Sequence, residues 1–298
     1  MDNTVRLSAS DHLPLRACPL CECQVSTPVF QTIRKCGSCG LSFVSPLGNF
    51  HGENETEEYF LSDYLPLHRA NWQNSLAERR AHLELIRRYS SLPFQPRLLD
   101  VGCALGFMLQ EAKAAGWDAV GVETSGFAAR YASEHTGCTV YEGTLQNAGL
   151  EPASFDVVTL MDVIEHIPEP CTLLREVSRV LRPGGTIFLV TPNFGSFFVW
   201  LYGPKAYGIG PDEHVTYFSR ANIKIALRKS GFHRIIAGSK DFYADNLNRL
   251  LNGRNNASQP RIKAAFRADT SLSKVRKLVN GVLMHVPLGD KLIALAQK

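Results

Sequence analysis

The chain has 298 residues, 45% of them hydrophobic and 20% charged, and a formal net charge of +4 at pH 7. This composition is typical of a globular protein with one large domain, or with one ordinary domain and a small one, and it excludes a wholly disordered or fibrous chain. No apolar run reaches the roughly 18 residues of a membrane-spanning helix, and the N-terminal residues lack the apolar core of a secretory signal, so we expect a cytoplasmic protein.

The eight cysteines carry the first specific signal. Four of them form two Cys-x-x-Cys pairs that are separated by fourteen residues. Paired turns of this kind place four thiolates around one tetrahedral zinc ion, and four protein ligands leave no open position for chemistry. Disulfides would need an oxidising compartment. We therefore predict a structural zinc-ribbon module over residues 1–50, with the ligands Cys18, Cys21, Cys36 and Cys39.

Residues 51–92 are expected to form a linker followed by an amphipathic helix. The stretch from residue 48 to residue 58 is acidic and rich in turn residues. Between Leu67 and Tyr89, apolar residues recur at spacings of three, four and seven, with arginine and glutamate between them. Two prolines, Pro93 and Pro96, then mark the start of the main domain.

From residue 93 to residue 298, short apolar runs alternate with segments of helical periodicity. This alternation predicts an α/β fold: a Rossmann-like, doubly wound and mostly parallel sheet of seven strands. We expect helices at residues 107–115, 126–134, 169–181 and 219–230, and strands at residues 97–101, 119–123, 139–142, 155–161, 186–191, 234–237 and 292–296.

The segment before the last expected strand is basic. From residue 240 to the end, eleven lysines and arginines stand against four aspartates. About residues 240–288 are expected to form a helical insertion. A solvated helix face accounts for such charge, and so does a surface for phosphate, an anionic lipid head group or nucleic acid.

The turn after the first strand is the first candidate binding site. Strand residues 98–101 lead into Gly-Cys-Ala-Leu-Gly and then directly into a helix, so that backbone amides can approach a ligand at the helix N-terminus. Asp100 ends the strand, and Glu123 ends the next strand, where a carboxylate can bind both hydroxyls of a ribose. The glycine spacing does not fit the pattern of NAD or FAD sites.

These segments resemble the class I S-adenosylmethionine-dependent methyltransferases. LLDVGCALGFMLQEA is similar to their first motif, AVGVETS to the acidic strand end, FDVVTLMDVIEHIPEP to the fourth-strand motif, and LREVSRVLRPGGTIFLVTPN to the elements that follow. The resemblance covers about residues 90–240 and implies S-adenosylmethionine as the cofactor. The cofactor-binding residues that it implies are Asp100, Gly102, Cys103, Gly106, Glu123, Thr144, Leu145, Met161 and Asp162.

Two departures from the family pattern bear on this site. Ala104 stands where the family usually has glycine, so an added methyl group would crowd the cofactor's place in the turn. After the third strand, Gly143, Thr144 and Leu145 lack the aspartate that often binds the adenine amino group. A fold that has lost its cofactor is the alternative that these departures leave open.

Methyl transfer to a hydroxyl or a carbon acid requires a base. The candidates are His166, with Glu165 before it, which follow the fourth strand, and His214 with its neighbour Glu213. Bracing of a loop is the alternative role for the segment at His166. The ribbon and the segment EHVTYFS together are similar to bacterial sugar methyltransferases, and that resemblance implies that Glu213 and His214 serve the acceptor.

The resemblance implies a small-molecule acceptor, such as a nucleotide-linked or lipid-linked sugar. Carbon-methylating members of that family carry a Tyr-His pair where this chain has Pro211 and Asp212, so a hydroxyl is favoured over a carbon. A lipid-linked acceptor would bring the protein to a membrane surface, where the basic residues 261–277 could contact lipid head groups. The aromatic stretch at residues 194–203 is interpreted either as core or as a lid over the acceptor.

Two other functions compete with this interpretation. Some ribosomal RNA methyltransferases also join a cysteine-rich module to this fold, but the Asn-Pro-Pro-aromatic type of motif is missing after the fourth strand, so binding of nucleic acid is not favoured. A non-catalytic zinc-binding interaction protein with a vestigial cofactor fold is the second. Asp100 and Glu123 argue against it, since a decayed site has no need of both carboxylates.

Overall fold

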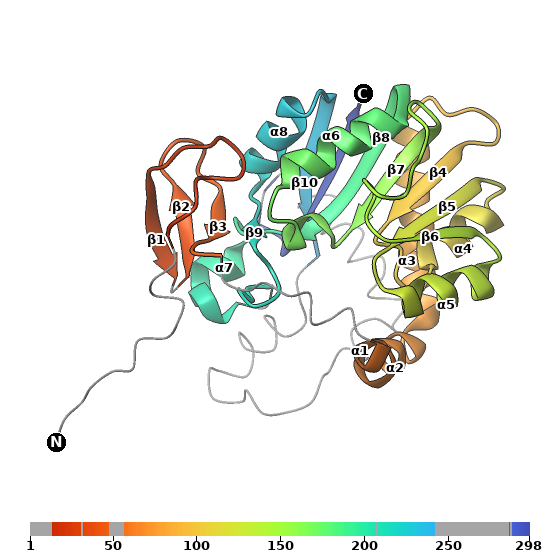
Figure 1. Cartoon of the computed structure of the whole chain (residues 1–298), viewed down its shortest axis with the longest axis horizontal. Helices are drawn as coiled ribbons and strands as arrows, with labels where there is room; N and C mark the ends of the chain where they lie inside the picture. Colours follow the sequence, from red (N-terminus) through yellow and green to blue (C-terminus); the bar gives the residue numbers. More distant parts are fainter. Residues whose placement is uncertain (1–13, 31, 48–56, 207, 242–285, 287) are drawn as a thin grey trace.

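The structure is a computed structural model that describes residues 14–30, 32–47, 57–206, 208–241, 286 and 288–298. Its main part is a seven-stranded sheet with helices on both faces, and a small sheet stands beside it (Figure 1). Most of the expected basic insertion, residues 242–285, lies outside the described residues, as do residues 1–13 and 48–56. Among the described helices, none is long and apolar enough to cross a membrane.

The large sheet has the strand order β10-β11-β8-β7-β4-β5-β6. The pairs from β8 to β6 are parallel, and β11 runs antiparallel to both of its neighbours. This is the Rossmann-like, mostly parallel seven-stranded sheet that the alternating pattern predicts. The strands are β4 (Arg97–Val101), β5 (Asp118–Glu123), β6 (Thr139–Glu142), β7 (Phe155–Met161), β8 (Leu181–Pro192), β10 (His233–Lys240) and β11 (Lys291–Gln297).

Successive side chains of each central strand point to opposite faces of the sheet. On β4, Leu99 packs into the core that contains α6 and α8, whereas Leu98 packs into the core that contains α3 and α4. On β7, Val158 and Val157 divide between the two cores in the same way. Both faces of the sheet are therefore buried, and the free carboxyl ends of the parallel strands form the edge at which a ligand can enter.

Most helices match the expected ranges within one or two residues. The predicted single helix from residue 67 to residue 89 is instead divided at residues 70–71, because Pro66 starts a separate short helix before it. The helices are α1 (Glu57–Tyr59), the π-helix η3 (Phe60–Tyr64), α2 (Leu65–Arg69), α3 (Trp72–Tyr89), α4 (Phe107–Ala114), α5 (Gly126–Thr136), α6 (Pro170–Val180), α7 (Phe197–Tyr202) and α8 (Arg220–Lys229), with the 3-10 turns η4 (Ile164–His166) and η5 (Gly203–Lys205).

The small sheet combines strands from the N-terminal part of the chain with a strand that lies more than 170 residues later in the sequence. Its order is β1-β2-β3-β9, formed by β1 (Ser26–Phe30), β2 (Ile33–Cys36), β3 (Ser42–Val44) and β9 (Thr216–Tyr217). In this pairing Phe43 faces Thr216. The cysteine-rich segment and the EHVTYFS segment thus belong to one hydrogen-bonded sheet. Periodicity alone did not predict this pairing.

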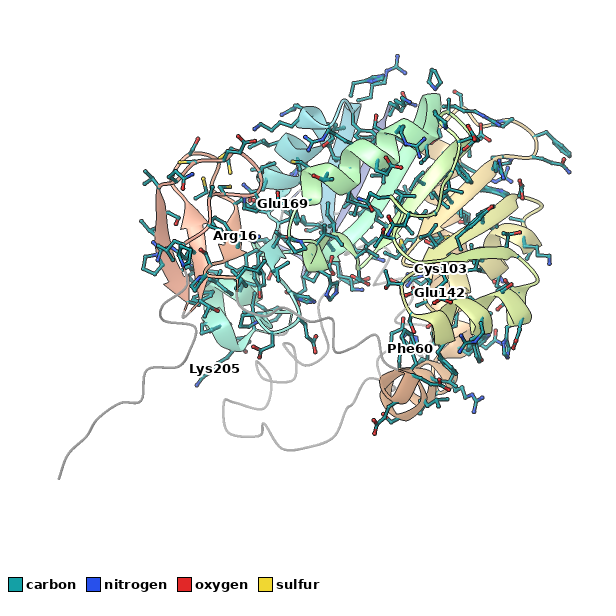
Figure 2. All side chains as sticks on the ribbon, viewed as in Figure 1. Arg16, Phe60, Cys103, Glu142, Glu169 and Lys205 are labelled. Atoms are coloured by element: carbon teal, nitrogen blue, oxygen red, sulfur yellow. The ribbon has the colours of Figure 1, made fainter. Side chains whose placement is uncertain are left out.

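Side-chain contacts fasten the small sheet to the main part. The Arg16 guanidinium donates to the carbonyl oxygens of Val44, Pro168 and Val215 at 2.9, 3.3 and 3.2 Å, and Figure 2 shows this side chain between the two sheets. The Asn222 amide on α8 donates to the Cys39 carbonyl at 2.7 Å. The cysteine-rich segment is therefore held against α8 and the β9 segment.

Candidate functional site

The turn between β4 and α4 has the close backbone approach that the sequence indicates. Gly102 and Gly106 have φ of +70° and +79°, and a Cβ on Gly102 would lie 2.6 Å from Cγ2 of Val163. A Cβ on Gly106 would lie 2.8 Å from Cγ2 of Thr136. Glycine is therefore required at both positions for conformational and steric reasons. The non-glycine residue Ala104 also has positive φ, at +46°.

Asp100 lies buried under this turn, with 3% of its surface exposed. Within the described part of the chain, the Thr159 hydroxyl hydrogen-bonds its carboxylate at 2.6 Å, and no lysine or arginine forms an ion pair with it. Burial raises the pKa of Asp100 to about 7, although the Thr159 hydrogen bond lowers it. The charge of Arg79 also lowers this pKa, but a buried acid that forms no ion pair with a described residue fits a ligand that brings a positive charge.

Glu123, at the end of β5, faces the same turn. Its Oε2 accepts from the Ala104 amide at 2.8 Å, and its Oε1 accepts from the Ser125 amide at 3.0 Å. Cys103 is buried beside both carboxylates, and burial, followed by their charges, raises the pKa of its thiol. The thiol is thus a neutral packing group in the turn, which Figure 2 marks at the strand ends.

The other predicted cofactor residues occupy the neighbouring strand ends. Leu145 is buried after β6, whereas Thr144 is exposed. Met161 ends β7, and Asp162 follows it with φ of +57° and pairs with Lys291 at 3.2 Å. All of the predicted residues therefore lie at the ends of β4, β5 and β7 or just after β4, β6 and β7, at one edge of the sheet, where the rule for open α/β sheets places a ligand.

A cluster of titratable side chains lies three residues beyond Asp162. One ligand atom each of Glu165, His166 and His214 lies within 4.8 Å of the others. The rings of His166 and His214 have centroids 4.8 Å apart at an interplanar angle of 76°. Glu213, the expected partner of His214, is exposed. The carboxylate that the fold brings to both histidines is that of Glu165, which the sequence associates only with His166.

Backbone contacts fix the two histidines in place. The Val215 amide donates to the Glu165 carbonyl at 2.9 Å, and the Thr216 hydroxyl donates to the Ile164 carbonyl at 3.1 Å. Nδ1 of His166 lies 2.8 Å from the Glu213 carbonyl oxygen. These contacts join η4 to the segment that begins β9, so neither histidine is on an independent loop.

The ring nitrogens have a defined protonation pattern. Nδ1 of His214 lies 3.0 Å from the Gly208 carbonyl oxygen, as Nδ1 of His166 does from that of Glu213 at 2.8 Å. A carbonyl oxygen only accepts, so each Nδ1 carries a proton and each Nε2 keeps a lone pair when the ring is neutral. Burial, and then the charge of His166, lowers the pKa of His214.

Glu165 is the most buried member of the cluster, with 2% of its surface exposed. Its Oε2 accepts from the Thr191 hydroxyl at 2.8 Å, whereas Oε1 has no hydrogen-bond partner among the described residues. Burial, and then the Asp162 charge, raises the pKa of Glu165 to about 8.

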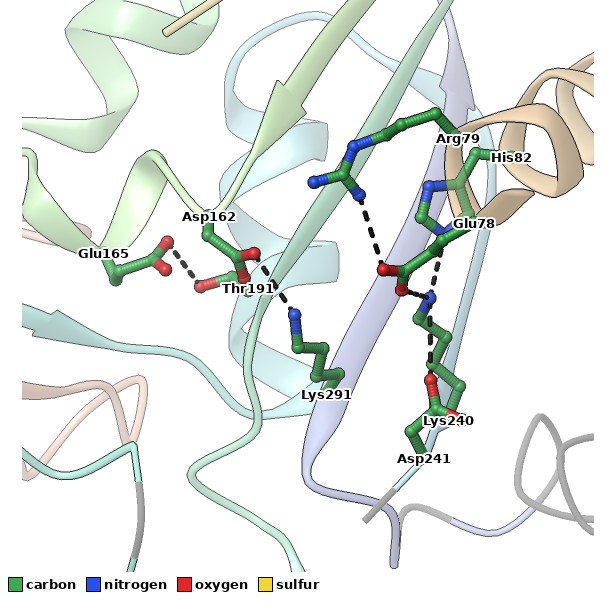
Figure 3. A network of polar contacts seen from close by, with 9 residues as sticks. All are labelled: Glu78, Arg79, His82, Asp162, Glu165, Thr191, Lys240, Asp241 and Lys291. Carbon is green, nitrogen blue, oxygen red and sulfur yellow. Dashed lines mark hydrogen bonds and ion pairs between the residues drawn. The ribbon is translucent and has the colours of Figure 1, made fainter. Parts of the chain in front are cut away.

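A polar network beside this cluster connects α3 with the strands β10 and β11 (Figure 3). The ammonium of Lys240 lies 2.7 Å from Oε1 of Glu78 and 2.8 Å from Nε2 of His82. Lys291 reaches Asp162 from β11, so charged residues border the cofactor edge from three elements. The helical pattern of residues 67–89 predicts that Glu78 and His82 lie on the same face of the helix. It does not predict that this face contacts Lys240.

The four predicted zinc ligands lie together. The sulfur atoms of Cys18 and Cys39 are 3.5 Å apart, and those of Cys21 and Cys36 are 3.4 Å apart. A tetrahedron with bonds of about 2.3 Å has edges of about 3.8 Å, so the donor set has the size of a zinc site. Cys23 is outside the cluster, and its thiol contacts the Val25 carbonyl.

The aromatic stretch, interpreted from the sequence as core or as a lid, contains a short helix in the structure. Phe198 on α7 is buried, whereas Trp200 is 78% exposed. The Ser196 hydroxyl caps the helix by accepting from the Val199 amide at 3.2 Å. The stretch thus divides between core and surface.

A protein-family model described as "Methyltransferase domain" matches residues 70–235. This match covers more than half of the chain and includes the turn after β4, Glu123, the histidine cluster and β9. The four-cysteine segment precedes the matched range.

Curated relatives match the central part of the chain. An enzyme of Methylococcus capsulatus named ubiquinone biosynthesis O-methyltransferase is 34% identical over 117 residues, which are 37% of this chain and 49% of the relative. One of the same name from Ralstonia nicotianae is 34% identical over 136 residues, 44% of this chain and 53% of the relative. The chain thus spans about half the length of these relatives, which do not carry the name of a sugar methyltransferase.

Solved structures share the fold. Phosphoethanolamine N-methyltransferase 2 of Haemonchus contortus, in complex with S-adenosyl-L-methionine, superposes with a TM-score of 0.55 at 20% identity and covers 86% of this chain and 61% of that one. An S-adenosylmethionine-dependent methyltransferase of Thermotoga maritima gives 0.54 at 18% identity and covers 81% of this chain and 97% of that one. At such identities the likeness concerns the fold alone.

Proposed function

The chain belongs to the methyltransferase-domain family, and on that premise we propose that it transfers a methyl group from S-adenosylmethionine to a hydroxyl group of a small molecule. The dependence on S-adenosylmethionine follows from the family; the hydroxyl acceptor is the proposal. A non-catalytic interaction protein is not favoured, because the family match includes the turn with both carboxylates. The relatives named for ubiquinone biosynthesis are O-methyltransferases by name, which supports transfer to oxygen.

The residues of the turn fit this cofactor. When bound, S-adenosylmethionine supplies a methyl group on a positively charged sulfur. The buried carboxylate of Asp100 is suited to the ammonium group of the methionine part, and the positive φ of Gly102 and Gly106 shapes the turn above it. Glu123 is suited to the ribose hydroxyls after exchanging its hydrogen bond with the Ala104 amide. Met161 and Asp162 would border the reacting methyl.

The observation that carries the hydroxyl proposal is the cluster of Glu165, His166 and His214 just beyond Asp162. A hydroxyl must lose its proton as it accepts a methyl group, and a neutral imidazole within hydrogen-bond reach can take that proton. Nε2 of His214 has the free lone pair that this role requires, because Nδ1 is bonded to the Gly208 carbonyl. The Glu213 side chain is exposed, and its charge opposes the lowering of the His214 pKa by burial and by the charge of His166.

Two acceptor classes are consistent with this site. The ribbon and the EHVTYFS segment support a sugar hydroxyl, whether nucleotide-linked or lipid-linked, and the names of the relatives support a hydroxylated precursor of a quinone. Both are small molecules with a hydroxyl of high pKa, so both need the same proton acceptor. Transfer to nucleic acid is supported by none of these observations.

We also propose that Cys18, Cys21, Cys36 and Cys39 hold a structural zinc ion. The sulfur spacings and the all-thiolate donor set support it, and the site is closed to substrates because four protein ligands complete the tetrahedron. The ion would keep β3 in place to pair with β9.

The test is methyl transfer from radiolabelled S-adenosylmethionine to a panel of nucleotide sugars and hydroxylated quinone precursors, with products identified by mass spectrometry. His214→Ala should keep its affinity for S-adenosylhomocysteine within about threefold and lose transfer by at least about 100-fold. His233→Ala, an exposed histidine at the start of β10, is the matched control and should keep full activity. Full activity of His214→Ala would contradict the assigned base.

A further inference from the structure

We propose that Glu165, His166 and His214 form a second metal site, separate from the cysteine cluster, which binds one divalent cation and presents it to the acceptor hydroxyl. The two sites differ in their donors, since the first offers four sulfurs and the second two nitrogens and a carboxylate oxygen. The catalytic role of this cation rests on the proposed function: Nε2 of His214 can take the hydroxyl proton only while no ion is bound, and with the ion bound it is a ligand and the coordinated hydroxyl is acidified instead. Binding of the cation can be tested without any acceptor.

The geometry of the three donors carries the proposal. Their ligand atoms lie within 4.8 Å of one another, so ordinary metal–ligand bonds of about 2.0–2.2 Å to a central ion are within reach of small side-chain adjustments. The rings of His166 and His214 are nearly perpendicular, at 76°, which lets their edges converge without stacking. Two histidines and one carboxylate occupy one side of an ion and leave positions for substrate.

The hydrogen bonds of the histidines are those of metal ligands. Metal-binding histidines usually donate their other ring N–H to a carbonyl or carboxylate, which fixes the tautomer and the ring orientation. Nδ1 of His166 and Nδ1 of His214 both donate to backbone carbonyls, at 2.8 and 3.0 Å. Both Nε2 atoms are thereby prepared as ligands, although the two residues lie 48 positions apart in the chain.

Glu165 provides an independent observation. Its side chain is almost fully buried, and Oε1 has no hydrogen-bond partner among the described residues. A buried unpartnered carboxylate oxygen is costly unless it meets a proton donor or a cation. The hydrogen bond from Thr191 to Oε2 orients the carboxylate and leaves Oε1 as the available donor atom.

The location gives the ion a function. The cluster follows Asp162 at the cofactor edge, and a hydroxyl bound to a divalent cation has a strongly lowered pKa. In the transfer step the oxygen–methyl bond forms while the sulfur–methyl bond breaks, the sulfur keeps the electron pair, and the hydroxyl proton leaves to a water molecule. An acceptor with two adjacent oxygen atoms would coordinate best, because it can fill two open positions at once.

The experiment is a calorimetric titration of the full-length, zinc-loaded protein with Co²⁺, in the presence of S-adenosylhomocysteine. The expected result is one Co²⁺ per chain, without the charge-transfer absorption of cobalt–thiolate bonds, since the cysteine cluster keeps its zinc. Glu165→Gln and His214→Ala should each weaken Co²⁺ binding by at least about tenfold. His233→Ala is the control and should bind as the unchanged protein does.

Two results would overturn the proposal. One is the absence of Co²⁺ binding up to about 1 mM while S-adenosylhomocysteine still binds; the other is equal binding by Glu165→Gln and by the control, which places the ion elsewhere. Glu165→Gln keeps the size of the side chain, and its affinity for S-adenosylhomocysteine reports whether it has folded. Failure of the proposed function looks different, because Co²⁺ would then bind while no hydroxyl acceptor is methylated.

Discussion

The Thr159 hydroxyl on β7 donates a 2.6 Å hydrogen bond to the Asp100 carboxylate on β4. Both side chains are buried, and both lie on the sheet face that α3 and α4 cover. The hydrogen bond lowers the pKa of Asp100, while burial raises it to about 7. In the free protein, the pKa of the Asp100 carboxyl group therefore lies near neutral pH. The Thr159 hydroxyl helps to set this pKa.

Affinity for S-adenosylhomocysteine is expected to increase with pH up to about 7. Its ammonium group favours the ionised form of Asp100, so below the pKa the dissociation constant should fall about tenfold for each unit by which pH rises. Thr159→Val removes the hydrogen bond that lowers the pKa, and the plateau should move to higher pH. Calorimetric titrations between pH 5.5 and 8.5 would measure this; a pH-independent affinity in both proteins would contradict it.

Asp100→Asn should have opposite effects on stability and binding. The raised pKa means that the folded protein binds more protons than the unfolded chain between about pH 4 and pH 7, so ionisation of Asp100 destabilises the free fold as pH rises through this range. At pH 8 the variant should unfold at a higher urea concentration. Its affinity for S-adenosylhomocysteine should fall by about 10- to 100-fold, because a charged hydrogen bond is lost. Glu134→Gln, which neutralises an exposed acid on α5, is the control.

Ala104→Gly is expected to stabilise the turn. Ala104 has φ of +46°, a conformation that costs an L-residue about 1–2 kcal/mol relative to glycine. Greater freedom of glycine in the unfolded chain offsets about 0.4–1 kcal/mol of this gain, so the net stabilisation should be up to about 1.6 kcal/mol. Gly102→Ala should act in the opposite direction, since its Cβ would meet Val163. Urea unfolding of both variants measures the difference.

The ion pair of Lys240 and Glu78 should contribute strongly to stability. The Lys240 side chain is 9% exposed, and although burial raises the pKa of Glu78, the Lys240 charge helps to lower it well below its ordinary value. Lys240→Met would leave Glu78 without its main partner and should cost about 3 kcal/mol at pH 7. The stabilisation exists above the ordinary glutamate pKa and is lost as pH falls below it.

Removal of the second partner should restore part of the loss. In Lys240→Met/Glu78→Gln no uncompensated charge is left, so the double variant should be more stable than Lys240→Met alone. Urea unfolding of both single variants and the double variant completes the cycle, and additive changes in stability would show that the pair does not interact energetically.

Loss of zinc should loosen β9 while leaving the cofactor turn intact. Cys36→Ser, or treatment with a chelator, should lower the hydrogen-exchange protection of the amides at residues 42–44 and 215–217 by at least about tenfold, because β3 pairs with β9. Affinity for S-adenosylhomocysteine should change by less than about threefold. Cys23→Ser, whose thiol is outside the cluster, is the matched control.

The sequence predicts the strands better than it predicts the contacts between segments that are far apart in the chain. Apolar alternation predicts the strands that contain Asp100 and Glu123, and the Cys-x-x-Cys spacing predicts the cluster of four cysteines, because each belongs to a local pattern. The sequence associates Glu213 with His214, whereas the fold also brings Glu165 to that ring, because adjacency in sequence does not tell which other carboxylates lie near it. The pairing of β3 with β9 had no local signal, since it depends on how α8 and η4 position a two-residue strand.

The pairing of β3 with β9 sets the order of events while the chain is synthesised. Ser42 pairs with Tyr217, 175 positions further along the chain. At about 5–20 residues per second, residues 42–44 would wait on the order of 10–30 s for their partner strand. During that interval β3 is an unpaired sheet edge, a template for wrong pairing with another chain. A zinc ion bound early to the four cysteines would keep the exposed edge of β3 ordered until residues 216–217 have been synthesised and β9 can pair with it.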